Sequence, residues 1–206
     1  MPPEEFTDHL CQLLEGLNLP SDAKEVEQNM ILDLWDFAGQ HLYYASYPVF
    51  LSSRALYMLV YDLSKDLKDT AQPSFKQGIG EIPESNPNKE TTLDNFLTWL
   101  VSLSTMCSPK PEENHQQTKA KDLPYCRPPV FIVGTHADKP HQDIKEVESQ
   151  IKHEISGKDY ECHVIRPFFS VDNTQGSSDE GVVALQKKMI EILNEEPYMG
   201  EEVPIR

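Results

Sequence analysis

Apolar residues are concentrated in a few short runs along this chain. Three runs are strong and a fourth is weaker, and a polar turn follows each of the strong ones. Short apolar runs bounded by turns are typical of strands that are buried on both faces of a parallel sheet. The pattern therefore predicts strands over Met30–Trp35, Ala55–Asp62, Val130–Gly134 and Phe168–Val171.

Between and after these runs, apolar residues recur at the spacing of amphipathic helices. This spacing predicts helices over Thr91–Met106, with Thr91 and Asp94 as a capping box, over Asp143–Ile155, and over Ser177–Leu193, which opens with Ser177-x-x-Glu180. A stripe over Phe6–Leu19 predicts a further helix, packed on the core or, alternatively, bound to a partner. Strands that alternate with helices indicate right-handed βαβ units and an α/β fold.

Two long polar stretches interrupt this alternation. Ser64–Glu90 contains three prolines, and Ser108–Pro129 has the sequence KPEENHQQTKAKD at its centre. Connections of this length are uncommon in compact domains and are usually functional or disordered. We interpret both as loop insertions without regular structure, which are either tolerated solvated segments or sites of partner contact.

Composition narrows the classes of function. The chain has 206 residues, 34 acidic and 18 basic, and a net charge of −16. This charge opposes binding to nucleic acid or to anionic membranes, and no apolar run approaches the ~18 residues of a membrane span. The acidic N-terminus does not resemble a signal peptide. We therefore expect one soluble, cytoplasmic domain.

The four cysteines suggest neither a disulfide framework nor a zinc site. Cys11, Cys107, Cys126 and Cys162 are far apart and form no CxxC pair, and Cys162-His163 is the one Cys/His doublet. Buried free thiols and surface histidines are the interpretation that this spacing favours.

The segment Asp36-Phe37-Ala38-Gly39-Gln40 follows the first predicted strand and has the composition of a phosphoryl-transfer site. An aspartate at a strand end can hold Mg²⁺ through its water shell, and a following glutamine can orient an attacking water. Gly39 has no Cβ, so its N–H can approach a γ-phosphate. The alternative interpretation of Asp-x-x-Gly is an ordinary turn.

Two later segments have the chemistry of guanine recognition. Thr135-His136-Ala137-Asp138 stands in the place of the Asn-Lys-x-Asp motif of GTPases. Asp138 would accept the N1–H and 2-amino hydrogens of guanine, His136 would cover the base, and Thr135 would tie neighbouring loops together. Ser170-Val171-Asp172 would offer a backbone N–H to the guanine O6. The alternative for Thr135–Asp138 is a helix N-cap.

Together these segments resemble a known family. The run LWDFAGQHLYYASYPVFLSSRALYMLVYDLS and the segment PPVFIVGTHADKP resemble the Roc domain, the Ras-like GTPase of the Roco proteins, and GEEVPIR resembles the linker that leads into the COR domain. The resemblance implies a three-layer, Ras-like P-loop NTPase fold with a mostly parallel sheet. It also implies GTP or GDP with Mg²⁺ as ligands, a COR domain in cis, and a possible homodimer of the parent protein.

One part of the Roc pattern is missing from these 206 residues. No segment matches G-x-x-x-x-G-K-[ST], and residues 1–29 are too few for the first strand, phosphate loop, helix and second strand, which need roughly 40 residues. We therefore expect an N-terminally incomplete domain that does not bind GTP tightly, arising either from truncation or from loss of the loop. The expected organisation is a remnant over 1–29, a Roc-like domain over 30–195, and a linker over 196–206.

Two functions follow from these observations. The first is a guanine-nucleotide-regulated GTPase switch in a larger signalling protein, and Gln40 and Asp138 favour it. The second is a nucleotide-free scaffold or dimerisation module, and the absent phosphate loop favours it.

Overall fold

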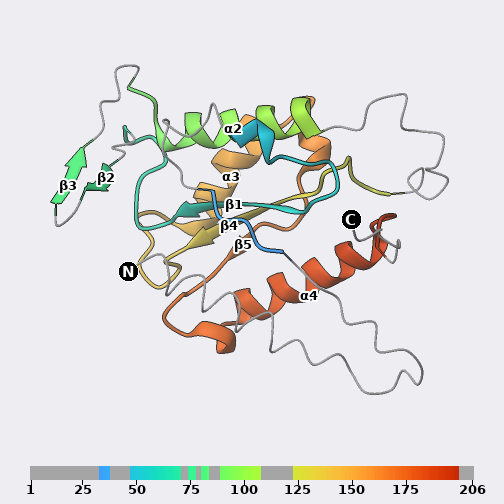
Figure 1. Ribbon diagram of the computed structural model, residues 1–206. Coiled ribbons are helices and arrows are strands. Elements are labelled where there is room, and N and C mark those ends of the chain that lie inside the picture. The colour runs from blue at the N-terminus through green and yellow to red at the C-terminus, as the bar shows by residue number, and fades with distance from the viewer. Residues whose placement is uncertain are drawn as a thin grey trace. The chain divides into compact units, whose positions relative to one another are not determined.

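The computed structural model describes residues 33–37, 47–70, 74–77, 80–83, 89–107 and 123–199. The chain divides into two units, Met1–Ala38 and Gly39–Arg206, and each is considered by itself. Every helix and strand named below belongs to the second unit, which Figure 1 shows with its elements labelled. In this part of the chain, no helix is both long and apolar enough to cross a membrane.

A three-stranded parallel sheet forms the centre of the second unit. Its strands are β1 (Tyr57–Asp62), β4 (Val130–Thr135) and β5 (Phe169–Ser170), in the order β1-β4-β5. All six residues of β4 are buried, as expected for a strand with a neighbour on each side and helices on both faces. The parallel sheet and these three strands are confirmed, with ends that differ by one or two residues from the sequence prediction.

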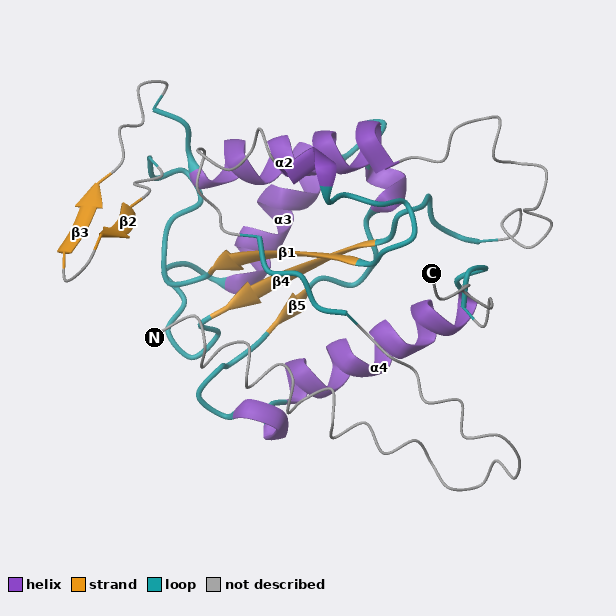
Figure 2. Cartoon of the chain, in the orientation of Figure 1, coloured by secondary structure: helices purple, strands orange, loops and turns teal. Residues whose placement is uncertain are grey.

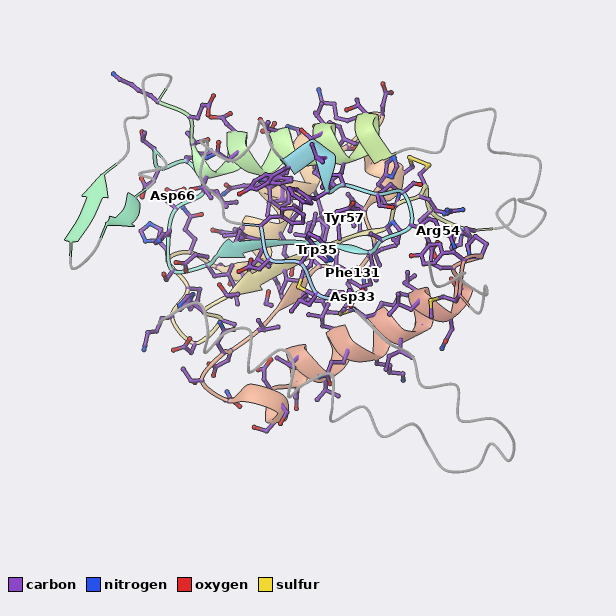
Figure 3. The ribbon with its side chains drawn as sticks, in the orientation of Figure 1. Asp33, Trp35, Arg54, Tyr57, Asp66 and Phe131 are labelled. Carbon is purple, nitrogen blue, oxygen red and sulfur yellow. A yellow bond between two sulfur atoms is a disulfide. The ribbon has the colours of Figure 1, made fainter. Side chains whose placement is uncertain are left out.

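The alternation of side chains along β4 divides the core into two layers. Val130 and Ile132 belong to the cluster that α2 (Thr92–Cys107) and α3 (Ile144–Ile155) complete, whereas Phe131 and Val133 pack with α4 (Glu180–Glu195). Figures 1 and 2 show α2 and α3 on one face of the sheet and α4 on the other, and Figure 3 labels Phe131 between the sheet and α4. The arrangement is a three-layer α/β fold.

Local capping sets the starts of α2 and α3. The Asp94 carboxylate accepts hydrogen bonds from the backbone N–H and hydroxyl of Thr91 (2.9 and 2.7 Å), and the Asp94 N–H donates to the Thr91 hydroxyl (3.1 Å). This reciprocal pair confirms the predicted capping box. Asp143, where the sequence predicted the helix to begin, caps α3 by accepting from the N–H groups of Lys145 and Glu146.

The prediction for the start of α4 was wrong by three residues. Gly176–Ser178 form a 3-10 turn, η6, and Asp179 caps the helix by accepting from the Val182 N–H at 2.9 Å. Asp179 outcompetes the predicted Ser177-x-x-Glu180 box because a carboxylate placed directly before an N-terminus also interacts favourably with the helix dipole.

The first insertion has more structure than the sequence predicted. Within Ser64–Glu90, β2 (Ser74–Gln77) and β3 (Gly80–Pro83) form a two-stranded antiparallel sheet. Leu67 is also buried in the main core. The prediction of a wholly irregular insertion was therefore wrong, because hairpin pairing and one anchoring leucine organise part of it.

The last residues of the second predicted insertion are packed at the start of β4. Residues 108–122 lie outside the described residues, but Pro128 and Pro129 are fully buried directly before β4. Cys126 forms a disulfide with Cys162, which precedes β5 at η5 (Glu161–His163). The prediction of free thiols was wrong for this pair, because the parallel arrangement of β4 and β5 places the segments before these strands side by side.

The remaining predictions of secondary structure concern the N-terminal unit and both ends of the chain. Asp33–Phe37 have no regular secondary structure, so the predicted strand over Met30–Trp35 is not seen in its described part. The predicted helix over Phe6–Leu19 and the final segment GEEVPIR lie outside the described residues. A further 3-10 turn, η2 (Tyr47–Val49), stacks the ring of Tyr47 on Trp99 of α2, with centroids 5.2 Å apart.

Candidate functional site

The register of the sheet brings several polar residues together at its carboxyl edge. Asp62 at the end of β1 pairs with Thr135 at the end of β4, and Ser170 of β5 pairs with Gly134. Figure 2 shows the three arrowheads pointing to the same edge. Ligand sites of open α/β sheets form at this edge because the loops that leave the strands converge there.

Thr135 holds the end of β4 against β1. Its buried hydroxyl donates to the Tyr61 carbonyl oxygen at 3.2 Å, and its own carbonyl accepts from the Leu63 N–H at 3.0 Å. The preceding Gly134 permits this contact, because an added Cβ would lie 2.9 Å from Leu63 and 3.0 Å from the ring of Tyr61. The loop that begins at Thr135 therefore starts from a fixed point.

His136 turns the loop through a left-handed backbone conformation with φ of 59°. Histidine tolerates this conformation better than most residues, but it is uncommon and is found at functional loops. Its Nδ1 lies 3.0 Å from Asp62 Oδ1, and its side chain is half exposed. The turn also lets the Ala137 N–H donate to the Val171 carbonyl at 3.1 Å, which joins the loop to the segment directly after β5.

Asp62 supplies a fixed negative charge beneath His136. Burial raises the pKa of this carboxyl group, but hydrogen bonds from Ser64 and the charges of His136 and Lys65 outweigh burial, so its pKa lies below the ordinary value. Asp62 therefore remains ionised at neutral pH and favours the tautomer of His136 in which Nδ1 carries a proton.

Asp138 has a partly exposed carboxylate with one weak partner. Its only polar contact among the described residues is an ion pair with the neighbouring Lys139 at 3.4 Å, and the Lys139 side chain is 79% exposed. Such a solvent-screened pair is worth little and is easily exchanged. Asp138 can therefore accept hydrogen bonds from a bound molecule without loss of a strong protein contact.

The loop after β5 differs in detail from the sequence expectation. The Val171 N–H donates to the Gly134 carbonyl at 2.8 Å and is thus used within the sheet. The Asp172 carboxylate accepts from the Thr174 N–H, the Thr174 hydroxyl and the Gln175 amide at 2.6–2.9 Å, and these bonds hold the pKa of Asp172 below its ordinary value. Among the described residues, the N–H groups of Asp172 and Asn173 have no hydrogen bond, so they are the first donors that could serve a ligand.

Comparison with known proteins identifies the family. Residues 12–110 match the family described as "Ras of Complex, Roc, domain of DAPkinase". These residues belong to the Roc domain family. Roc is a Ras-like P-loop GTPase domain, and the parallel sheet with helices on both faces agrees with that fold.

Three relatives of this Roc domain come from Dictyostelium discoideum. "Probable serine/threonine-protein kinase pats1" is 25% identical over 86% of the chain, which corresponds to 4% of that protein. "Probable serine/threonine-protein kinase roco6" is 48% identical over 55% of the chain and 3% of the relative, and "Probable serine/threonine-protein kinase roco5" is 32% identical over 24% and 2%. The chain thus spans only a few per cent of the length of the relatives it matches.

The described residues contain part of the site that the Roc resemblance predicted. Thr135, His136, Ser170 and Val171 converge at one edge of the sheet, and Asp138 lies on the same loop as His136. Asp36 is exposed and belongs to the N-terminal unit, while Gly39 and Gln40 lie outside the described residues.

The sequence analysis did not identify Asp62 as a site residue, and it named Asp172 without giving its side chain a role. Both are followed two residues later by a hydroxyl residue, Ser64 and Thr174, whose N–H and hydroxyl they accept. This Asp-x-Ser/Thr turn pattern directly after an apolar strand was the available signal.

Proposed function

We propose that this Roc domain recognises the guanine base through Asp138. The observation that carries the proposal is the weakly paired carboxylate of Asp138 on a loop that is hydrogen-bonded to the neighbouring strand β1 and to the loop after β5. A carboxylate can accept the N1–H and the 2-amino hydrogens of guanine side by side. Adenine has an acceptor at N1 and offers no such pair, so a site built on this carboxylate discriminates against it.

The neighbouring groups complement this role. The ring of His136 is half exposed and anchored at Nδ1 by Asp62, so its position would allow it to cover one face of the base. The O6 atom of guanine requires a donor, and the backbone N–H groups of Asp172 and Asn173 are better candidates than that of Val171, which bonds to Gly134. We assign Asp172 the role of holding these donors in place through its three accepted hydrogen bonds.

The phosphate side of the proposal rests on the sequence. Asp36 would hold Mg²⁺ through water, the Gly39 N–H would contact the γ-phosphate, and Gln40 would orient the attacking water. These roles require a phosphate loop, whose backbone N–H groups and lysine supply most of the binding to the β- and γ-phosphates. Such a segment, supplied outside these 206 residues, would make the domain a cytoplasmic GTPase switch that acts together with a COR domain in cis and within a homodimer.

A second function, a nucleotide-free scaffold with the Roc fold, is favoured by one observation. The 206 residues contain no G-x-x-x-x-G-K-[ST] motif. Charge-assisted contacts to phosphate are worth about 1.5–3 kcal/mol each, so the loss of several of them weakens nucleotide binding by many powers of ten. In this case the domain would act only through protein contacts.

A competition experiment distinguishes the two functions. Labelled GTP is bound to a form of the protein that includes a phosphate-loop segment and is displaced by ATP or XTP, with the Asp138→Asn variant in parallel. Two hydrogen bonds to a charged group predict a loss of GTP affinity of about 10²–10⁴-fold in the variant, with a gain for XTP, whose 2-oxo group and N1–H match an amide.

Asp159→Asn is the matched control, because Asp159 is exposed and precedes β5 at the opposite edge of the sheet. It should leave the order of nucleotides unchanged. Equal binding of GTP and ATP by the unmodified protein, or no gain for XTP in Asp138→Asn, would show that Asp138 does not read the base. Absence of any nucleotide binding would favour the scaffold.

A further inference from the structure

A cluster of metal-ligating side chains lies at the edge of the sheet opposite the nucleotide loops. Cys126 precedes β4, and Cys162 and His163 form part of the turn η5 before β5. The two cysteines are joined as a disulfide, their Cα atoms are 5.1 Å apart, and the Cys126 N–H donates to the Cys162 carbonyl at 2.7 Å. The backbone thus holds both sulfur atoms in proximity whether or not they are bonded to each other.

His163 is arranged as histidine ligands of metals usually are. His163 is 5% exposed, and its Nδ1 lies 3.0 Å from the Pro128 carbonyl oxygen. Because a carbonyl only accepts, Nδ1 carries the proton and Nε2 carries the lone pair of the neutral ring. A backbone carbonyl that binds one ring N–H commonly orients the other nitrogen toward a metal.

One further property of His163 favours metal binding. Among the described residues, no hydrogen bond to Nε2 is found, whereas Nδ1 faces the Pro128 carbonyl. Nε2 can therefore bind a cation without breaking another hydrogen bond.

The three side chains converge closely enough for one ion. One ligand atom from each of Cys126, Cys162 and His163 lies within 4.8 Å of the others. Zn–S distances of about 2.3 Å and Zn–N distances of about 2.0–2.1 Å place tetrahedral ligands roughly 3.5–3.8 Å apart, so shifts of about 1 Å complete the geometry. Both cysteines are exposed, which gives a reductant and an ion access to the sulfur atoms.

We propose that Cys126, Cys162 and His163 form a zinc-binding site when the disulfide is reduced, with water in the fourth position. Two thiolates and an imidazole suit Zn²⁺, whereas Mg²⁺ and Ca²⁺ require oxygen ligands. This site shares no residue with the proposed guanine site, so the two proposals stand or fall separately.

A thiol reductant supplies the electrons that open the Cys126–Cys162 disulfide. One dithiol, or two monothiols, gives two electrons and two protons to the Cys126–Cys162 bond and is itself oxidised to a disulfide. Zinc then displaces both thiol protons to solvent and binds the neutral ring of His163. A disulfide oxidant reverses these steps: it accepts two electrons from the two thiolates and is itself reduced to two thiols, while the Cys126–Cys162 bond re-forms and the ion is released.

Cobalt absorption tests the proposal on the whole 206-residue chain. The protein is reduced with a dithiol, freed of reductant without air, and titrated with Co²⁺ as a spectroscopic substitute for zinc. We expect one equivalent of Co²⁺ to give thiolate-to-cobalt charge-transfer absorption and the visible bands of a tetrahedral ion, and one equivalent of Zn²⁺ to abolish both. The oxidised protein should give neither signal.

Matched variants locate the ion. Cys11→Ser/Cys107→Ser retains only the two proposed cysteine ligands and should bind Co²⁺ as the unmodified chain does. Cys126→Ser/Cys162→Ser should lose the charge-transfer signal, and His163→Gln should weaken zinc affinity by more than about 10-fold. Circular dichroism establishes whether each variant folds.

A second measurement does not depend on the folding of the ligand variants. In Cys11→Ser/Cys107→Ser, one equivalent of Zn²⁺ should slow alkylation of both remaining thiols, as followed by mass spectrometry. The proposal is overturned if the reduced chain gives no tetrahedral Co²⁺ signal, if the signal is lost in Cys11→Ser/Cys107→Ser, or if zinc leaves alkylation unchanged.

Discussion

A buried ion pair at the end of α4 yields a quantitative prediction. The Glu196 side chain is 0% exposed and that of Arg127 is 8% exposed, with 3.2 Å between Arg127 Nε and Glu196 Oε2. The angle of this approach does not make a hydrogen bond, so the pair is held by charge, while the Tyr125 hydroxyl donates to Glu196 Oε1 at 3.2 Å. Arg54, labelled in Figure 3, lies over the ring of Tyr198 beside this pair.

The substitution Arg127→Ala should leave a buried carboxylate without its counter-charge. Removal of one partner of a buried pair costs about 3–5 kcal/mol. We expect about 3 kcal/mol of the free energy of unfolding, the lower limit, because Tyr125 still donates and no Arg127–Glu196 hydrogen bond is lost. For a domain of this size, that loss lowers Tm by roughly 6–12 °C.

The loss should depend on pH in a defined direction. Burial raises the pKa of Glu196, and Arg127 and Tyr125 offset burial only in part. Without Arg127 the folded-state pKa rises further. A carboxyl group with a raised folded-state pKa contributes stability that is complete below its unfolded value of 4.5 and is lost as pH rises through the folded-state value. The difference between variant and unmodified protein should therefore be largest at neutral pH and shrink toward pH 4.5.

Urea unfolding at neutral and acidic pH measures this effect. Arg166→Ala is the control, because the Arg166–Glu161 pair is 3.7 Å apart with both side chains 39% exposed, and it should cost less than about 1 kcal/mol. Adding Glu196→Gln to Arg127→Ala should restore part of the stability. The reasoning is refuted if Arg127→Ala costs no more than the control, or if its cost does not change with pH.

Three further predictions follow from the nucleotide side of the domain. Purified residues 1–206 should show no GTP binding by calorimetry at micromolar nucleotide, because they lack a phosphate loop, and a low-micromolar, Mg²⁺-dependent site would contradict this. Gly134→Ala should destabilise the domain by about 1–3 kcal/mol in chemical unfolding, because the new Cβ would lie 2.9 Å from Leu63; an unchanged midpoint would mean that the core adapts. Asp172→Asn should lower Tm at neutral pH but not in strong acid, because the lowered pKa of Asp172 gives stability that is present above its ordinary value of 3.8 and is lost as pH falls through the folded-state value; a pH-independent difference would contradict this.

The sequence by itself determined the parts of the fold that depend on neighbouring residues. The helix over Thr92–Cys107 follows from a capping box and an apolar stripe. In both patterns the interacting residues are three or four positions apart in the sequence. The fully buried strand β4 follows from its continuous apolar run. The order of strands and helices then predicted a parallel sheet. The segment Thr135–Asp138 was identified as a candidate site because it stands at the end of the apolar run that forms β4.

Only the tertiary structure decided which distant residues meet. Cys126 and Cys162 are separated by 36 residues, and no local spacing indicates their contact, which arises because β4 and β5 run parallel and start at the same edge. Arg127 reaches Glu196 for a similar reason, since α4 returns along the sheet to the level where β4 begins. The hydrogen bond from the Val171 N–H to the Gly134 carbonyl likewise depends on the register of β4 and β5. A shift of one residue would change which backbone groups face the neighbouring strand. Local periodicity in the sequence determines the helices and strands. The path of the chain between them determines which side chains and backbone groups meet at a site.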